Sequence, residues 1–204
     1  MAPYLTLGLL LPLLAGPAAA ATGRQVTPWA GYVSGGSLLE RATGDVLRIG
    51  SAAGFGVVLD LPAWTGASYE VVYGFQKTEL SGDDASGRNL RRGLDIHYVH
   101  VGGLTEFGEG TVRPFLVGGL GLTALVPDGR GSSSNFSLSL GGGVKVPLSD
   151  RVELRLEGRG YLTFIADSGG IFCVSSGASG GCTAGGEGRT LGQLAVLAGL
   201  SFRP

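Results

Sequence analysis

The chain has 204 residues, enough for one domain, and its formal net charge of −1 points neither to a nucleic-acid partner nor to an acidic substrate. Charged residues make up 15% of the chain, whereas a soluble domain carries about 25%, and glycine is very frequent at 39 residues. After the opening segment, no apolar stretch is long enough to span a bilayer as a helix. This composition predicts a chain that is either very well buried or embedded in lipid as strands.

The first predicted element is a targeting segment. Residues 5–14 are almost entirely apolar, and a Gly-Pro pair and four alanines follow them. A short apolar run closed by small residues is typical of a secretory signal peptide. We therefore expect residues 1–20 to be a cleaved signal peptide, with cleavage after Ala20 or Ala21, and residues 21–204 to form a single β-barrel domain.

Beyond this segment the apolar residues recur with a period of two, which predicts β-strands and no helix of any length. Most of the segments exceed the five or six residues of an average strand and suit a tilted crossing of a membrane, which takes about 9–11 residues. The eight predicted strands are residues 27–34, 49–61, 67–80, 91–105, 111–126, 135–148, 151–166 and 191–202.

The connections between these segments alternate in length. The short ones are residues 62–66, 106–110 and 149–150, and the long, polar, Gly/Ser-rich ones are residues 35–48, 81–90, 127–134 and 167–190. Membrane barrels have short turns at one end and long loops at the other. The sequence therefore predicts an all-β fold, an eight-stranded antiparallel up-and-down transmembrane β-barrel. The expected number of strands becomes ten if the first or last long loop contains a hairpin.

Alternation by itself does not show which face of a strand points inward. A soluble, lipocalin-like barrel would place its apolar face inside. Three features favour the inverted arrangement of a membrane barrel: lysine is scarce, the last strand is apolar at alternate positions, and aromatic residues fall near strand ends. These aromatic residues, expected to form an interfacial girdle, are Trp29, Trp64, Tyr161, Phe164 and Phe202.

The most distinctive chemical feature is a ladder of alternating charges in residues 151–166. The interior of an eight-stranded barrel is just wide enough to be filled by side chains, and buried charges must be paired. We expect a lumen charge network, with Glu70 and Arg113 as further partners and with His100 on the outer face or at a rim. The predicted members are Asp95, His97, Lys145, Glu153, Arg155, Glu157 and Arg159. The ladder fits a structural plug of salt bridges better than an ion pathway.

Two cysteines, Cys173 and Cys182, lie in the last long connection. An exported protein meets an oxidising compartment, so we expect them to form a disulfide within this loop. No His or carboxylate stands beside them at a spacing that suits a metal, and the sequence predicts no cofactor.

Two stretches resemble a known family. Residues 138–164, LSLGGGVKVPLSDRVELRLEGRGYLTF, and residues 194–202, LAVLAGLSF, are similar to strands of the small outer-membrane β-barrels of the OmpA and OmpX type, often labelled porin-like. The resemblance implies the outer membrane of a diderm bacterium, contact with outer-membrane lipid and lipopolysaccharide, and insertion by the barrel-assembly machinery. Family members usually end on an aromatic residue, whereas here Arg203 and Pro204 follow Phe202.

These features predict a non-enzymatic outer-membrane protein with a structural or surface-interaction role and a filled lumen. The alternatives are a narrow channel for small solutes and, less favoured, an enzyme that modifies lipid A. One small-barrel family deacylates lipid A with a His that is followed two residues later by a Ser, but Val99 and Gly102 stand at those positions after His97 and His100. The sequence indicates no nucleic-acid partner and names no extracellular ligand.

Overall fold

A computed structural model describes residues 23–39, 46–83, 89–108, 110–129, 131–165 and 189–204. The expected signal peptide and the expected disulfide between Cys173 and Cys182 lie outside these residues. Among the described residues, no helix is long and apolar enough to cross a membrane.

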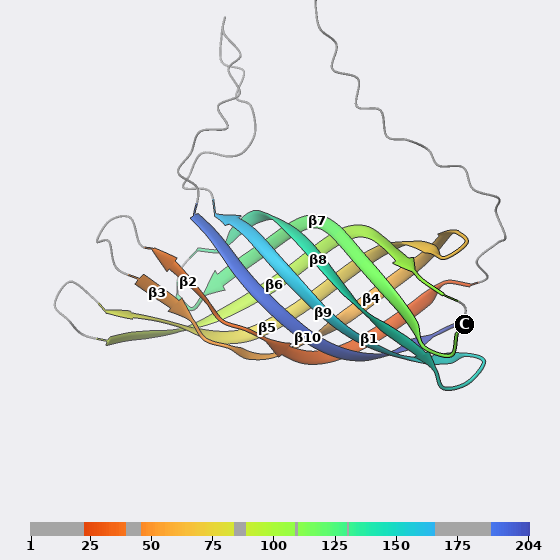
Figure 1. Ribbon diagram of the computed structural model, residues 1–204. Helices are drawn as coiled ribbons and strands as arrows, with labels where there is room; N and C mark the ends of the chain where they lie inside the picture. The colour runs from red at the N-terminus through yellow and green to blue at the C-terminus, as the bar shows by residue number, and fades with distance from the viewer. Residues whose placement is uncertain (1–22, 40–45, 84–88, 109, 130, 166–188) are drawn as a thin grey trace, which may run out of the picture.

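The described chain folds into one closed antiparallel barrel (Figure 1). Its strands are β1 (Gln25–Val33), β2 (Gly36–Leu39), β3 (Val46–Ile49), β4 (Ala52–Trp64), β5 (Ala67–Asp83), β6 (Asn89–Glu106), β7 (Arg113–Pro127), β8 (Ser133–Pro147), β9 (Val152–Ile165) and β10 (Arg189–Phe202). Eight of them form the wall in the order β5-β4-β1-β10-β9-β8-β7-β6, and pairing of β5 with β6 closes the ring. The predicted eight-stranded antiparallel barrel is confirmed.

The two ends of the barrel differ. One end, here called the turn end, carries the short connections together with Gln25 and Phe202, where the first and last strands begin and end. At the other end, the loop end, β2 and β3 form a short hairpin inside the first long connection, and β3 pairs with β5. β5 and β6 stay paired as far as Asp83 and Asn89, so these four strands project beyond the barrel (Figure 1). The first long loop does contain a hairpin, but this hairpin adds no strand to the wall.

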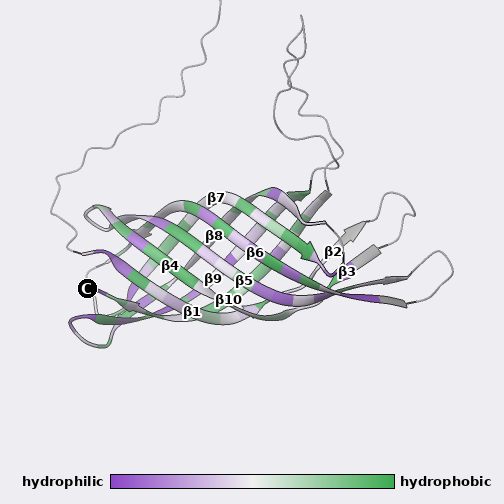
Figure 2. Cartoon of the chain, turned by 180° about the vertical axis from the view of Figure 1, so that it is seen from behind, coloured by the Kyte–Doolittle hydropathy of each residue, from purple (hydrophilic) through white to green (hydrophobic). Residues whose placement is uncertain are grey.

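The outer wall of the barrel is apolar. Along each strand, one set of side chains faces the interior and the alternate set is exposed, and hydrophobic and hydrophilic segments alternate in Figure 2. Exposed large apolar residues lie on every wall strand, for example Phe55, Tyr69, Val101, Leu140 and Val196. The interior holds many buried polar and charged side chains. Such an inside-out distribution is that of a transmembrane barrel and not of a soluble one.

Glycines at inward positions allow the strands to coil tightly around a narrow lumen. At Gly143 on β8, an added Cβ would lie 2.8 Å from Cζ of Phe115 and closer still to the carbonyl oxygen of Leu156 on the neighbouring strand. At Gly158, an outward position of β9, an added Cβ would meet nothing within 4 Å. Glycine in a strand commonly marks such a close backbone approach.

This difference predicts unequal effects of two alanine substitutions. Gly143→Ala should lower the free energy of unfolding by about 1–3 kcal/mol, because the neighbouring backbone must move. Gly158→Ala should stay within about 0.5 kcal/mol of the original protein. Urea titrations of both variants in the same detergent micelles measure the two values, and equal losses would contradict the packing described above.

Candidate functional site

The lumen at the turn end is filled by charged side chains, which we call the lumen charge network. Among the described residues it contains five acidic side chains and five basic ones, so its formal charge is zero. They are Asp60, Glu70, Glu106, Glu153 and Glu157, and Arg113, Lys145, Arg155, Arg159 and Arg203. Buried charges are tolerated when each has a partner, and here the strands on opposite walls supply the partners.

Arg155 lies at the centre of the network and is fully buried. Its Nη1 donates to Asp60 on β4 at 3.2 Å, its Nη2 to Glu70 on β5 at 2.6 Å, and its Nε to Glu157 on its own strand at 2.8 Å. The guanidinium group also lies 4.8 Å from the ring centroid of Phe115. One side chain of β9 thus reaches across the barrel to β4 and β5.

Asp60 and Glu70 are register partners on adjacent strands, so two like charges face each other. Such a pair destabilises a sheet unless cations lie between the carboxylates. Besides Arg155, Asp60 accepts from Nζ of Lys145 at 3.2 Å, and Glu70 accepts from Nη2 of Arg159 at 2.7 Å. Three cations therefore hold this acidic pair inside the barrel.

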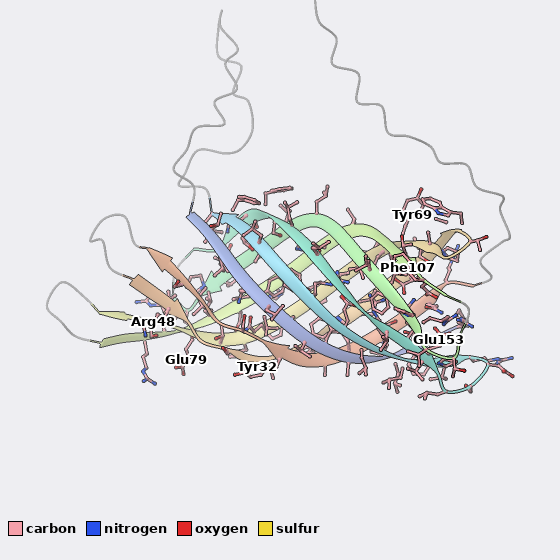
Figure 3. All side chains as sticks on the ribbon, viewed as in Figure 1. Tyr32, Arg48, Tyr69, Glu79, Phe107 and Glu153 are labelled. Carbon is pink, nitrogen blue, oxygen red and sulfur yellow. The ribbon has the colours of Figure 1, made fainter. Side chains whose placement is uncertain are left out.

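Glu153 joins the two ends of the described chain. It accepts from Nε2 of Gln25, at the start of β1, at 3.1 Å, and it pairs with Arg113 of β7 and with Arg203, which follows β10. The backbone N–H of Arg203 also donates to the carbonyl oxygen of Arg151 at 2.9 Å. Glu153 is buried and lies near the turn end of the barrel (Figure 3). The seam between β1 and β10 is thereby linked to the network.

The structure brings together five of the seven residues that the sequence assigned to the network. They are Lys145, Glu153, Arg155, Glu157 and Arg159. The expected partners Glu70 and Arg113 also belong to it.

Asp95 and His97 require a correction, because they face outward and not into the lumen. On β6 the even-numbered residues from 94 to 100 are buried inside the barrel, and the odd-numbered Asp95 and His97 lie on the opposite face. The ring of His97 instead packs 5.0 Å from the ring of Phe75 on the outer wall. The reason is that Leu94, Ile96 and Tyr98 pack into an apolar cluster inside the barrel, so the residues between them on β6 face outward.

His100 is also placed differently from the expectation. It is buried in the lumen, where Nδ1 lies 3.1 Å from Oγ of Ser139 and Nε2 lies 2.9 Å from Oγ of Ser137. Ser137 continues the chain of hydrogen bonds to Thr123 at 3.0 Å. A Ser–His contact is the first element of a nucleophilic site. Here both hydroxyls and the imidazole are buried inside the barrel.

The half of the lumen nearer the loop end holds an apolar cluster together with buried uncharged polar side chains such as Gln76 and Gln193. The apolar cluster, here called the apolar plug, contains Val33, Ile49, Leu94, Ile96, Tyr98, Leu125, Tyr161, Leu191 and Ala195. The rings of Tyr98 and Tyr161 stack at 4.5 Å between their centroids, on the same level as His100. Two residues of the expected aromatic girdle are therefore corrected: Tyr161 belongs to this plug, and Trp29 is buried inside the barrel. The plug lies between the lumen charge network and the loop end.

The sequence missed Asp60, Glu106 and Arg203 as members of the network. Asp60 could have been found as a carboxylate between apolar neighbours in a predicted strand, which needs a buried partner. Glu106 and Arg203 stand at strand ends, where the period-two pattern carries no information about the inward direction.

Solved structures of other proteins share the fold of this chain at low sequence identity. Neisserial surface protein A is 15% identical with a TM-score of 0.60, over 90% of this chain and 98% of that one. The outer membrane protein OprG from Pseudomonas aeruginosa is 11% identical with a TM-score of 0.55, over 89% and 96% of the two chains. Outer membrane protein AlkL, solved in DMPC bilayers, is 12% identical with a TM-score of 0.53, over 92% and 93%.

No protein-family model and no curated protein matches the chain. The structural neighbours show that its fold is that of the small outer-membrane β-barrels. The resemblance seen in the sequence is therefore confirmed for the fold.

Proposed function

We propose that this protein is a non-enzymatic outer-membrane barrel whose lumen is closed, so that it serves as a membrane anchor for the structures at its loop end and not as a channel. The apolar outer wall and the fold support a place in the membrane. The short connections at the turn end would face the periplasm, and the projecting strands β2, β3, β5 and β6 would face the outside, as in other bacterial barrels.

The observation that carries the proposal is the mutual neutralisation of the lumen charge network. A conducting pore needs unpaired charges or water along its axis, with binding weak enough to let ions leave. Here Glu70 and Glu157 each contact two arginines at 2.5–2.7 Å, so the charges of these arginines are paired within the protein. On the loop side, the apolar plug and the buried amides of Gln76 and Gln193, which accept from the Tyr98 hydroxyl, occupy the lumen.

The same closure argues against the two alternatives. A channel would have to cross the apolar plug, where side chains such as Ile96 and Leu191 are fully buried against one another. A lipid A-modifying enzyme would need its nucleophile on the lipid side of the wall, but Ser137 and Ser139 face the lumen. The arrangement therefore supports the structural role over either of them.

Conductance measurements test the closed lumen. Purified, refolded protein added to planar bilayers is expected to give no unit steps above those of a detergent-only control, while a general porin in the same bilayers gives them. Reproducible steps that appear with folded protein and disappear after heat unfolding would show an open path and would favour the channel.

A further inference from the structure

The outer wall carries charged side chains in one sector only. Among the side chains that the structure describes, the outward positions of β1, β4, β7, β8, β9 and β10 hold no aspartate, glutamate, lysine or arginine. Near the loop end, the outward positions of β5 and β6 hold four such residues, which we call the charged sector. They are Lys77 and Glu79 on β5, and Arg91 and Asp95 on β6. The proposed function makes no use of them.

The signs of these charges run in opposite order on the two strands. Towards the loop end, β5 carries Lys77 and then Glu79, whereas β6 carries Asp95 and then Arg91. Lys77 and Asp95 are register partners. The guanidinium group of Arg91 reaches the level of Glu79, because it lies 3.9 Å from that carboxylate. The charged sector therefore holds two positive and two negative groups that alternate in sign both along and across the strands.

The charged sector begins where the apolar band of the outer wall ends. On β5 the outward residues are apolar or aromatic from Tyr69 to Phe75, and they are charged at Lys77 and Glu79. The ring of Phe75, two residues before Lys77 on the same face, lies 5.2 Å from that of Phe55. Glu79 lies on the projecting strands (Figure 3). The apolar band of a membrane barrel ends at the headgroups, so a second barrel in the same membrane can meet the aromatic surface and the charges together.

The charges of this sector are available to another molecule. Within the described part of the chain, neither Lys77 nor Asp95 forms an ion pair or a side-chain hydrogen bond, although they are register partners. Arg91 and Glu79 do pair, but their side chains are 74% and 67% exposed, and such exposed pairs are weak. The charged sector thus differs from the lumen charge network, in which the cations and carboxylates pair with one another inside the barrel.

The distribution and the balance of the charges select the occupant. Lipid surrounds a barrel on all sides, so contact with lipid does not account for charges that are confined to β5 and β6. A polyanion or a polycation would require an excess of one sign, whereas the charged sector has two of each. Complementary surfaces place opposite charges against each other, and a surface with alternating signs is complementary to a second copy of itself.

We propose that the charged sector is the contact surface of a two-fold symmetric dimer, in which a second copy of this chain packs through its own β5 and β6 in the same membrane. The inference rests on the proposed place of the protein in the membrane and not on the closed lumen. A two-fold axis parallel to the barrel axis places β5 of one copy against β6 of the other, and every contact occurs twice. Lys77 then meets the second copy's Asp95, and Glu79 meets the second copy's Arg91.

Charge reversal tests this proposal, with native mass spectrometry of the refolded full chain in a neutral detergent as the measurement of dimer. The original protein should form dimers. Lys77→Glu and Asp95→Lys should each lower the association constant about tenfold or more, because each places like charges opposite each other at two points. Mixed in equal amounts, with one variant labelled with ¹⁵N, the two variants should form mixed dimers about tenfold in excess of either homodimer, because each reversed charge then faces an opposite one.

Arg151→Glu is the matched control, because it reverses an exposed cation at the turn end, and it should dimerise like the original protein. The double variant Lys77→Glu/Asp95→Lys should also dimerise, which separates the loss in the single variants from misfolding. A monomeric original protein overturns the dimer, as do single variants that behave like the control, a mixture that forms no mixed dimers, or monomers that carry bound lipid which the charge reversals release. Because association does not depend on conductance, its failure leaves the closed lumen untouched, and a conducting barrel leaves the dimer standing.

Discussion

Arg155→Leu is expected to lower the free energy of unfolding by about 3–5 kcal/mol, the range for removing one partner from a buried ion cluster. The substitution leaves four basic and five acidic side chains in the lumen charge network. Asp60 and Glu70 then face each other without the guanidinium group that separates them. Glu157 also loses one of its two arginines. The cost comes mainly from these carboxylates, which stay buried after their cation is gone.

A compensating variant separates this cause from loss of packing. In Arg155→Leu/Glu157→Leu, four charges of each sign remain, and the pairs Asp60–Lys145 and Glu70–Arg159 are intact. The double variant should therefore recover part of the lost stability, because replacing a whole buried pair by apolar groups is often close to neutral. Arg151→Leu, at an exposed turn position, serves as a control with little effect.

Urea titrations in detergent micelles, followed by tryptophan fluorescence, measure all three variants. A single variant that is no less stable than the control would mean that the network contributes nothing to the fold. A double variant less stable than Arg155→Leu would attribute the loss to side-chain volume instead of charge.

Leu140→Arg is expected to cost about 2–4 kcal/mol in lipid vesicles, the range for an arginine on the lipid face near the bilayer midplane. Leu140 lies at the middle of β8 and is 74% exposed. Its register partners on both sides are glycines, Gly118 and Gly160, so no neighbouring side chain would shield the guanidinium group from the acyl chains.

The control is Leu148→Arg, which makes the same substitution at another depth. Leu148 follows β8 at the turn end and is 59% exposed. Near the interface an arginine costs about 0–1 kcal/mol, so the two variants should differ by at least 1 kcal/mol. Guanidinium titrations of vesicle-inserted protein provide the comparison. Two equally mild variants would mean that the outer wall meets water, which is the arrangement of a soluble barrel.

The fold was predictable because the period-two pattern is strong on most strands. On β9 every charged residue of the ladder alternates with an apolar or small one, and both bounds of the strand fall within one residue of the prediction. On β6 the period-two pattern does not show which face is inward. The inward face of β6 combines Ile96 with His100, and its outward face combines Asp95 with Val99, so neither face is the polar one along the whole strand.

The network was predictable only along one strand. The ladder of β9 is visible in the sequence, but Asp60 joins it through closure of the barrel, which brings β4 opposite β9. Arg203 joins it through the pairing of β10 with β9, at a position just past the predicted last strand. The lumen also changes from charged at the turn end to uncharged and largely apolar towards the loop end. A single rule that places polar residues inside therefore fails for Asp95 and His97.

The two tryptophans of the chain provide built-in optical probes of opposite sides of the wall. Trp29 is 6% exposed and lies inside the barrel, whereas Trp64 is 51% exposed on the outer wall at the turn end. A brominated lipid should quench the emission of Trp64 and spare that of Trp29. In a Trp64→Phe protein the remaining signal comes from the interior alone, so its blue shift during refolding would record the packing of Trp29 among Val58, Val72 and Leu197 as the barrel forms.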